Sequence, residues 1–269
     1  MKKILFETIR NYDCRLTPVS LERIVSKKYG FERRRVKAAI KSLVTSGDLV
    51  YTYRFGCTFL EPSYGKPTRV SRRVILKPPE MSYHAEPGDI VISLKHGAAF
   101  GYGRHPTTRL SVQAIEYLHE KMGGFPKERK TRILDIGTGS GILVLTAVFF
   151  GIDSGIGIDI DPCAISETRE NIHINRLQKK IIVDNRPLER IGGPFFMITA
   201  NLRFPTLVKL AGVIREHMEP NGCLVLSGIK TDELDRLIDV YAAADFACIW
   251  KEAEKNWAGI ALIKKGFEK

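Results

Sequence analysis

The sequence lacks the signatures of several structural classes. Its 5 cysteines are scattered, with no C-x-x-C pair and no histidine cluster, so the pattern predicts neither a structural zinc site nor a disulfide framework. No apolar run approaches the ~20 residues of a membrane-spanning helix, and the first residues carry no signal-peptide core. We therefore expect a reduced, cytoplasmic protein that binds no metal and no membrane.

A glycine-rich turn at residues 137–141 lacks the features of two phosphate-binding motifs. Ile142 stands at the third glycine position of G-x-G-x-x-G, and no Gly-Lys-Ser/Thr follows. Both absences argue against a pyrophosphate ligand. An apolar strand with one carboxylate does precede the alternating glycines, and an apolar helical pattern follows them. This strand, turn and helix start form the geometry that holds a nucleotide-like ligand, because glycines let the backbone come close to it.

The positive charge of the chain is confined to its first quarter. The formal net charge is +12, from 42 basic and 30 acidic residues. Residues 1–77 alone hold 18 lysines and arginines against 6 acidic residues, so the remaining 24 basic and 24 acidic residues cancel. Such asymmetry indicates a basic module that precedes a neutral, enzyme-like body.

The basic module is predicted to contain three helices and a hairpin. Apolar residues recur at helical spacing three times before residue 46, and two short strand patterns follow on either side of residues 54–56. This order resembles a winged helix-turn-helix, whose third helix enters the DNA major groove. Here that helix would present Arg33, Arg34, Lys37 and Lys41. Charge alone supports only non-specific binding, so a solvated face and a face that docks protein or RNA stay as alternatives.

The remainder of the chain alternates strands with helices, which predicts the α/β class. We expect a doubly wound, Rossmann-like sheet with an antiparallel edge strand. The predicted division is a winged-helix-like domain at residues 1–62, a proline- and arginine-rich linker or arm at residues 63–84, and the α/β domain at residues 85–269. Residues 69–76 of the arm are compatible with a short strand.

Polar residues end three predicted strands of this sheet, where ligands of open α/β sheets bind. Asp159 lies 22 residues beyond Gly137, near the ~20-residue offset of a carboxylate that grips ribose hydroxyls. Asp184 either caps a turn or lies beside an adenine ring. Asn201 either satisfies its own loop or faces the ligand, and its position at a strand end favours the ligand.

A glycine-rich loop at residues 97–107, the approach loop, leads to a helix whose first turn carries Thr107 and Thr108. Such threonines usually cap the helix, but a hydroxyl and free N–H groups at a helix start also suit a ligand carboxylate. His105 in this loop is expected to be structural more often than a proton-transfer group.

Four segments together resemble the PrmA-like protein methyltransferases, a group within the class I S-adenosylmethionine-dependent methyltransferases. The segments are Phe100-Gly-Tyr-Gly-Arg-His-Pro-Thr-Thr108, Asp135-Ile-Gly-Thr-Gly-Ser-Gly-Ile-Leu143, Ile158-Asp-Ile-Asp-Pro162 and Leu226-Ser-Gly-Ile229. The best-known members trimethylate amines of a large-subunit ribosomal protein. The resemblance covers residues 85–265 and implies S-adenosylmethionine as the cofactor. It implies cofactor contacts at Thr108, Gly137, Asp159 and Asn201, with Asn201 also at the reacting centre. We expect Asp135, Gly139 and Asp184 to bind the cofactor as well.

The chain departs from this family where a substrate would enter. Asn201 opens Asn-Leu-Arg-Phe instead of Asn-Ile-Leu-Ala, and Tyr102 and Arg104 stand where two threonines are usual. The basic front module also replaces a ferredoxin-like recognition domain. The resemblance therefore implies a methyltransferase acting on a protein amine, with a ribosomal protein among the candidate substrates.

Two other functions stay open at this point. One is an RNA or DNA methyltransferase guided by the front module, although the absence of an Asn/Asp-Pro-Pro-Tyr/Phe sequence argues against a flipped base. The other is a non-enzymatic regulator that binds S-adenosylmethionine, which the apparently complete set of cofactor contacts disfavours.

Overall fold

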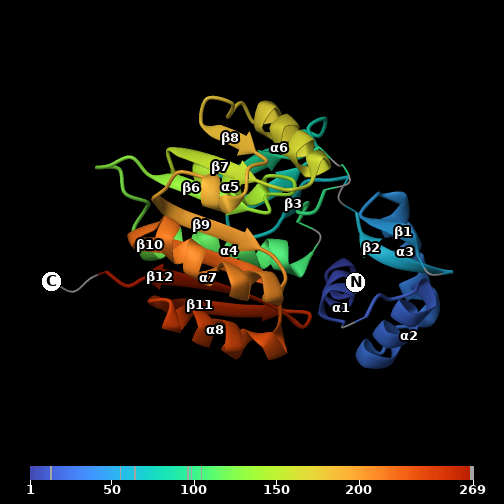
Figure 1. Ribbon diagram of the computed structural model, residues 1–269. Helices are drawn as coiled ribbons and strands as arrows, with labels where there is room; N and C mark the ends of the chain where they lie inside the picture. The colour runs from blue at the N-terminus through green and yellow to red at the C-terminus, as the bar shows by residue number, and fades with distance from the viewer. Residues whose placement is uncertain are drawn as a thin grey trace. The chain divides into compact units, whose positions relative to one another are not determined.

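The computed structural model describes residues 1–12, 14–54, 56–63, 65–95, 97, 99–103 and 105–266. The chain divides into two compact units, which we call the front unit (Met1–Pro67) and the second unit (Thr68–Lys269). Figure 1 shows the elements of each unit along the chain. We describe each unit by itself.

The front unit has the predicted order of three helices and one antiparallel hairpin. The elements are α1 (Lys2–Asn11), α2 (Pro18–Tyr29), α3 (Arg33–Thr45), β1 (Leu49–Arg54) and β2 (Cys57–Pro62). Thr17 caps α2 by accepting from the Ser20 amide, and Gly30 ends that helix in the left-handed region at φ +71°. One buried face from each helix meets residues of the hairpin in a small apolar core.

The second unit begins earlier than the boundary predicted from the sequence. Residues 68–93 contain a small sheet, β3 (Thr68–Arg69), β4 (Val74–Lys77) and β5 (Ile90–Ser93), in which β4 pairs antiparallel with β3 and parallel with β5. Val74 and Ile92 are fully buried in the core of the second unit. Residues 68–84 of the expected linker or arm group with the second unit, and the short strand that residues 69–76 allow is present in part as β4. The local sequence does not reveal the distant strand β5 with which β4 pairs.

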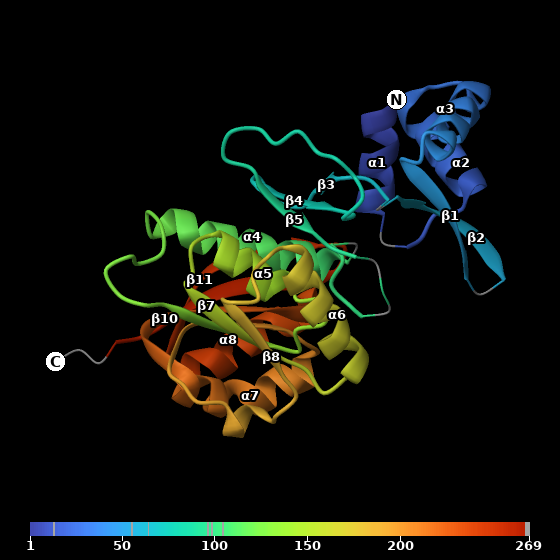
Figure 2. The ribbon, with the colours of Figure 1, turned by 90° about the horizontal axis from the view of Figure 1, so that it is seen from above.

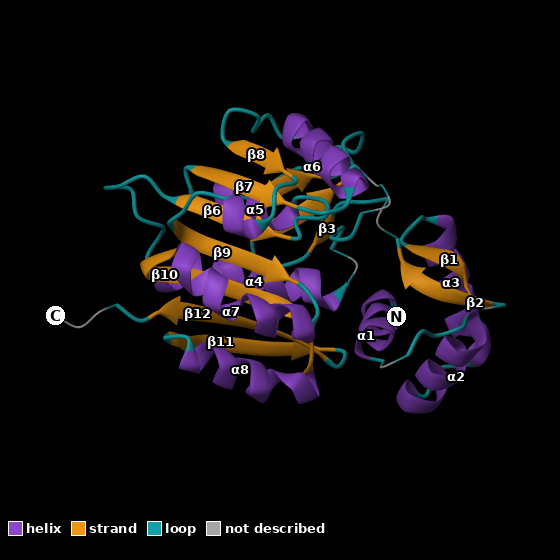
Figure 3. Cartoon of the chain, viewed as in Figure 1, coloured by secondary structure: helices purple, strands orange, loops and turns teal. Residues whose placement is uncertain are grey.

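The main body is a seven-stranded sheet with the order β11-β12-β10-β9-β6-β7-β8. Its strands are β6 (Arg132–Ile136), β7 (Ser154–Ile158), β8 (Ile181–Asp184), β9 (Phe195–Asn201), β10 (Met218–Lys230), β11 (Phe246–Glu254) and β12 (Trp257–Lys264). Strands β6 to β10 are mutually parallel, so their carboxyl ends share one edge (Figure 3). The reversed strand is β12, which lies between β10 and the outermost strand β11, one place inside the predicted edge.

Helices cover both faces of this sheet, as the doubly wound class requires. They are α4 (Pro106–Lys121), α5 (Ile142–Phe149), α6 (Pro162–Ile174), α7 (Phe204–His217) and α8 (Leu234–Ala243). Apolar side chains of α4, α5 and α6 form one core with the sheet and with β4 and β5, and those of α7 and α8 form the other. Figure 2 shows α4 and α5 on one side of the sheet and α7 and α8 on the opposite side.

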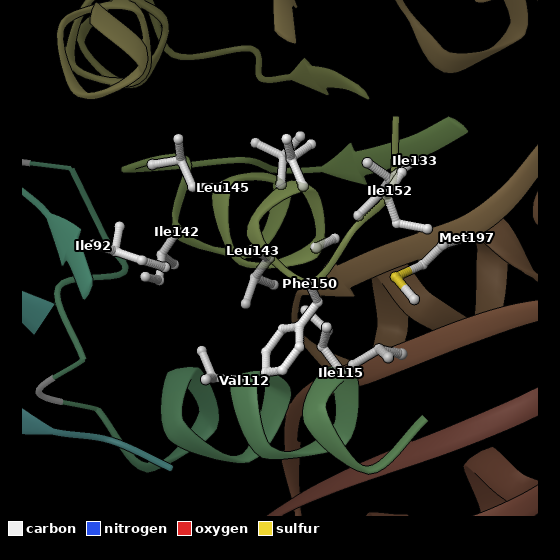
Figure 4. Packing of buried hydrophobic residues seen from close by; sticks show 14 of the residues in the cluster. Ile92, Val112, Ile115, Ile133, Ile142, Leu143, Leu145, Phe150, Ile152 and Met197 are labelled. Atoms are coloured by element: carbon white, nitrogen blue, oxygen red, sulfur yellow. The ribbon is translucent and has the colours of Figure 1, made fainter. Parts of the chain in front are cut away.

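The strongly apolar α5 anchors the glycine-rich turn within the first core. Leu143 and Phe150 extend from this segment toward Val112 and Ile115 of α4, while Ile142 lies near Ile92 of β5 (Figure 4). All six side chains are at most 5% exposed. A helix packed on several sides holds its first turn in place, and the turn ends at that helix.

Candidate functional site

The glycine-rich turn between β6 and α5 requires glycine for steric reasons. Gly137, Gly139 and Gly141 all have positive φ angles, of 71°, 57° and 82°. A Cβ on Gly139 would lie 2.4 Å from the carbonyl oxygen of Phe100, and one on Gly141 would lie 2.8 Å from the Thr168 methyl. The turn is therefore packed against the approach loop and α6, and no other residue fits without a displacement.

The backbone N–H groups of this turn are already committed within the chain. The amides of Gly137 and Thr138 donate to the Ile158 carbonyl, at 2.9 and 3.0 Å. The next three, of residues 139–141, donate respectively to Asp159 Oδ2, the Phe100 carbonyl and the Thr138 carbonyl. A phosphate-binding turn instead directs free N–H groups at its ligand. The geometry thus agrees with the missing third glycine and disfavours a pyrophosphate.

Asp135 is buried beneath the glycine-rich turn and is hydrogen-bonded to residues of the turn and of β9. It is fully buried, and its two carboxylate oxygens accept from Thr199 Oγ1 at 2.7 Å and Thr138 Oγ1 at 2.8 Å. Burial raises the pKa of Asp135 to about 6, against the lowering effect of these hydrogen bonds and of the Val144 amide. Both carboxylate oxygens of Asp135 are therefore engaged inside the protein, where they link the turn to β9.

Asp159 follows β7 and lies where the spacing predicts a ribose-binding carboxylate. Its Oδ2 accepts from the Gly139 amide and its Oδ1 accepts from the Asp161 amide, both at 3.0 Å. These two bonds fix the orientation of a partly exposed carboxylate, and each oxygen keeps a second lone pair. Each oxygen of the carboxylate can therefore accept one further hydrogen bond.

Asp184 ends β8, and its carboxylate is engaged by Arg186. It accepts from the Arg186 amide at 2.8 Å and from the guanidinium Nε at 2.7 Å, and the guanidinium holds the pKa of Asp184 below its usual range. The backbone carbonyl of Asp184 also accepts from the Asp159 amide at 3.3 Å. Asp184 thus caps a turn, and its carbonyl links it to the backbone of Asp159.

The approach loop places Thr108 in the first turn of α4. His105 is the N-cap, and its Nδ1 is 2.8 Å from Thr107 Oγ1 and accepts weakly from the Thr107 amide at 3.4 Å. His105 thus caps the helix, as its expected structural role predicts, and the Thr108 side chain does not take part in this cap. The amide of Thr108 donates to the His105 carbonyl at 3.1 Å.

Three buried polar atoms at the site have no hydrogen-bond partner. In the described part of the chain 7 buried side-chain polar atoms lack one, and 3 of them are Thr108 Oγ1, Ser140 Oγ and Asn201 Oδ1. Ser140 lies within the glycine turn, Asn201 follows Ala200, which pairs with Ile136 just before that turn, and Thr108 lies in the first turn of α4. Unsatisfied buried oxygens cost free energy, so each of them could accept from a donor that a ligand supplies. Ser140 was not among the predicted residues, and its place within the glycine turn is the signal that could have identified it.

The approach loop is also attached to α6. Glu167 accepts from the Ala99 amide at 3.0 Å, and Tyr102 donates its hydroxyl to the same carboxylate. Burial, together with this bond, raises the pKa of Tyr102. Tyr102, one of the residues that depart from the family, therefore stabilises the loop through α6. Arg104, the other one, lies outside the described residues.

An aromatic and cationic cluster at this edge was not predicted from the sequence. The Trp257 ring has Lys230 Nζ at 3.8 Å and the Arg203 guanidinium carbon at 5.1 Å from its centroid. The imidazole of His105 meets the same ring edge-on, with centroids 4.7 Å apart. Because β12 runs antiparallel to β10, its first residue Trp257 lies beside the carboxyl ends of the parallel strands. Only the reversed strand explains this position, so linear spacing could not reveal it.

The helix α3 of the front unit shows the predicted basic face. Arg33 is engaged by Glu22 at 2.8 Å. The side chains of Arg34, Lys37 and Lys41 are exposed, and the described part of the chain contains no ion-pair partner for any of them.

Metal-binding groups and membrane-spanning helices were also considered among the described residues. Among the described residues no group of three or more histidine, cysteine, aspartate or glutamate side chains is arranged to hold a metal ion. The helices that the structure describes include none with both the length and the apolar character needed to span a membrane.

Comparisons with known proteins were made on the whole chain. The sequence profile of the family described as ribosomal protein L11 methyltransferase (PrmA) matches residues 61–265. A ribosomal protein L11 methyltransferase from Geobacter metallireducens is 37% identical over 192 residues, which are 71% of this chain and 60% of that protein. The one from Pelobacter propionicus is 39% identical over 201 residues, 74% of this chain and 62% of that protein. The chain thus spans less than two thirds of the length of these relatives.

Solved structures of methyltransferases share the fold of this chain. The crystal structure of a ribosomal protein L11 methylase from Lactobacillus delbrueckii subsp. bulgaricus superposes with a TM-score of 0.65 at 27% sequence identity. The match covers 74% of this chain and 99% of that chain. A methyltransferase from Pyrococcus furiosus, with a TM-score of 0.50 and 17% identity, shares the fold alone.

Proposed function

Because the chain belongs to the ribosomal protein L11 methyltransferase (PrmA) family, we propose that it transfers methyl groups from S-adenosylmethionine to amines of a protein. Ribosomal protein L11 is the first candidate substrate, since the matched relatives carry that name. Such a substrate would place the reaction in the cytoplasm.

The three unsatisfied oxygens of Thr108, Ser140 and Asn201 carry the proposal. S-adenosylmethionine has an ammonium group that donates hydrogen bonds and ribose hydroxyls that can pair with a carboxylate. Asp159 would hold the ribose, and the unsatisfied oxygens would accept from the remaining donors. The committed amides of residues 137–141 agree with a ligand that has no phosphate.

The residues of the chain would act mainly by alignment. The cofactor supplies an electrophilic methyl group on a sulfonium sulfur. Asn201 Oδ1 would accept from an N–H of the acceptor amine and so direct its lone pair toward the reacting carbon. An amine reacts only when neutral, and transfer from water to a partly buried site lowers the pKa of a lysine. Asn201 therefore orients the amine without serving as a base.

The test is methylation of purified L11 from the same organism. We expect the tritiated methyl group of S-adenosylmethionine to appear in L11, with a rate reduced about a hundredfold by Asn201→Ala. A parallel reaction uses ribonucleoprotein lysate as the substrate, and its labelled product is split into two portions, one digested with nuclease and one with protease. Label that survives protease but is lost with nuclease would contradict a protein substrate and favour the RNA or DNA alternative. Cofactor binding without any label would favour the non-enzymatic regulator.

We also propose that the front unit binds nucleic acid through the exposed face of α3. Arg34, Lys37 and Lys41 recur at helical spacing and are separated by the small side chains of Ala38 and Ser42. Cations without a large apolar centre suit phosphates better than a protein interface. We expect the full chain to bind a mixed-sequence duplex with an affinity that falls steeply with salt. Equal binding by the Arg34→Gln/Lys37→Gln/Lys41→Gln variant would contradict this role.

A further inference from the structure

We propose that Trp257, Arg203 and Lys230 form a subsite for an anionic group, which we name the Trp257 subsite. The group is the carboxylate of an acidic residue close to the methylated amine in a peptide segment. The inference rests on the proposed function, since it assigns the chemical class of the substrate segment that enters the same site.

The two cations of the subsite are held on one ring. Lys230 Nζ lies 3.8 Å and the Arg203 guanidinium carbon 5.1 Å from the Trp257 centroid. Arg203 Nη1 also donates to the Gly228 carbonyl at 2.9 Å, so the guanidinium is oriented before any ligand arrives. The two charges therefore lie less than about 10 Å apart, within one Debye length at moderate salt, where like charges repel. An anion beside both of them relieves that repulsion.

The acidic groups around the subsite compensate only part of this charge. Glu233 Oε1 is 3.8 Å from Arg203 Nη2, beyond hydrogen-bond distance, while Glu233 Oε2 accepts from the Lys230 amide at 2.7 Å. Glu254, on the hairpin that leads to Trp257, is paired with Arg109. Arg203 keeps a side-chain exposure of 53%, so an incoming carboxylate can reach it.

The subsite adjoins the reacting centre through two separate connections. Arg203 is two residues beyond Asn201, so the two Cα atoms are at most about 7 Å apart. His105 meets Trp257 with a centroid distance of 4.7 Å and caps the helix that presents Thr108. A carboxylate held on Arg203 would therefore belong to a residue within a few positions of the methylated lysine.

The composition of the subsite favours a peptide over a nucleic acid. A nucleic-acid groove follows the backbone with repeated cations and offers open aromatic faces to the bases. Here Lys230 and Arg203 already lie against the Trp257 ring, and Glu233 stands beside them. A single carboxylate matches two cations and one neighbouring acid better than a run of phosphates does.

The experiment follows binding by tryptophan fluorescence in the full chain with S-adenosylhomocysteine present. The chain has 2 tryptophans, so Trp250→Phe leaves Trp257 as the single reporter. The probes are the peptide Ala-Ala-Glu-Lys-Ala-Ala and its glutamine counterpart. We expect the glutamate peptide to bind about fivefold more tightly, as for one partly exposed ion pair. Arg203→Gln and Lys230→Gln should each reduce that ratio toward one, whereas Arg236→Gln, which removes a guanidinium from the Phe204 ring instead, should preserve it.

Equal affinities of the two peptides for the parent protein would overturn the subsite. So would a ratio that persists in both Arg203→Gln and Lys230→Gln while circular dichroism shows all variants folded. Tighter binding of the oligonucleotide hexathymidylate, lost in the same two variants, would overturn the peptide in favour of a nucleic acid. Because no methyl transfer is measured, these results are independent of whether L11 is methylated.

Discussion

The two sides of the candidate site are built on different principles. On the glycine-turn side, the backbone amides of residues 137–141 and the carboxylates of Asp135 and Asp159 are bonded to one another or to neighbouring strands. On the Asn201 side, the Asn201 oxygen has no partner in the described part of the chain, and Arg203 and Lys230 rest on Trp257. On the first side the backbone amides form a closed network, and of the turn's side chains only the Ser140 hydroxyl has no partner among the described residues. The second consists of side chains whose polar groups are available to a substrate.

Alanine at Gly139 should break the closed network most severely. The substitution adds left-handed strain and places a Cβ only 2.4 Å from the Phe100 carbonyl oxygen, so we expect it to lower the free energy of unfolding by about 3 kcal/mol. Gly123→Ala is the matched control, because Gly123 has a φ of +67° but nothing within 4 Å of the added Cβ. It should cost about 1 kcal/mol in the same urea titrations. Equal losses would show that strain alone, and not contact with the approach loop, makes glycine necessary.

Asp135 should make the stability of this network depend on pH. Its pKa in the folded protein is raised from 3.8 to about 6 by burial, so the folded state holds the proton more tightly than the unfolded chain. The resulting stabilisation is complete below pH 3.8 and is lost as the pH rises through about 6. It amounts to roughly 3 kcal/mol for a shift of ~2 units. Between pH 4 and 7 the unfolding free energy of the parent should fall relative to that of Asp135→Asn, and parallel curves would contradict the assignment.

Asp159 and Asp184, which the sequence predicts as cofactor-binding residues, should differ in how much their substitution weakens cofactor binding. Asp159 has a free lone pair on each oxygen, so Asp159→Asn should weaken S-adenosylmethionine binding ten- to thirtyfold, about 2 kcal/mol. Asp184 is engaged by Arg186, so Asp184→Asn should change affinity less than threefold. Calorimetry on both variants checks the contrast. A larger loss at Asp184 would restore the adenine contact.

The smallest expected effect on cofactor binding concerns the Thr108 hydroxyl, which has no partner among the described residues. Because Oγ1 of Thr108 has no partner in the described part of the chain, Thr108→Val should leave the unfolding free energy unchanged or slightly higher. The same substitution should weaken S-adenosylmethionine binding about fivefold, or ~1 kcal/mol. Thr107→Val reverses the pattern, since Thr107 Oγ1 is bonded to His105 and its loss should cost stability. A stability loss in Thr108→Val would place its hydroxyl in a structural bond.

Sequence reasoning reached the parts of the site that depend on local chain geometry. The glycine turn, Asp159 and Asn201 all lie at strand ends, where residue type and spacing carry the information. It failed where tertiary contacts decide. The burial of Asp135 between Thr138 and Thr199 requires knowing that β9 lies beside β6. Trp257 reaches the site only because β12 is reversed.

The small sheet shows the same limit on a larger scale. The sequence allows a short strand over most of β4 but does not identify its partner, because β5 begins 13 residues after β4 ends, beyond an irregular stretch. A run of four residues carries no indication of such a partner, and only the parallel pairing explains why Val74 is fully buried. Local patterns therefore locate the reacting edge of the sheet but not the elements that support it.

The central claim is that the glycine-rich turn binds S-adenosylmethionine and not a dinucleotide. The most direct test is calorimetric titration of the full chain with S-adenosylmethionine and with NAD⁺, using both the parent protein and Asp159→Asn. The committed amides of residues 137–141 and the unsatisfied oxygens of Thr108, Ser140 and Asn201 predict that S-adenosylmethionine binds and NAD⁺ does not. The substitution should remove most of that affinity. Binding of NAD⁺ at comparable strength, or S-adenosylmethionine affinity that Asp159→Asn leaves intact, would contradict it.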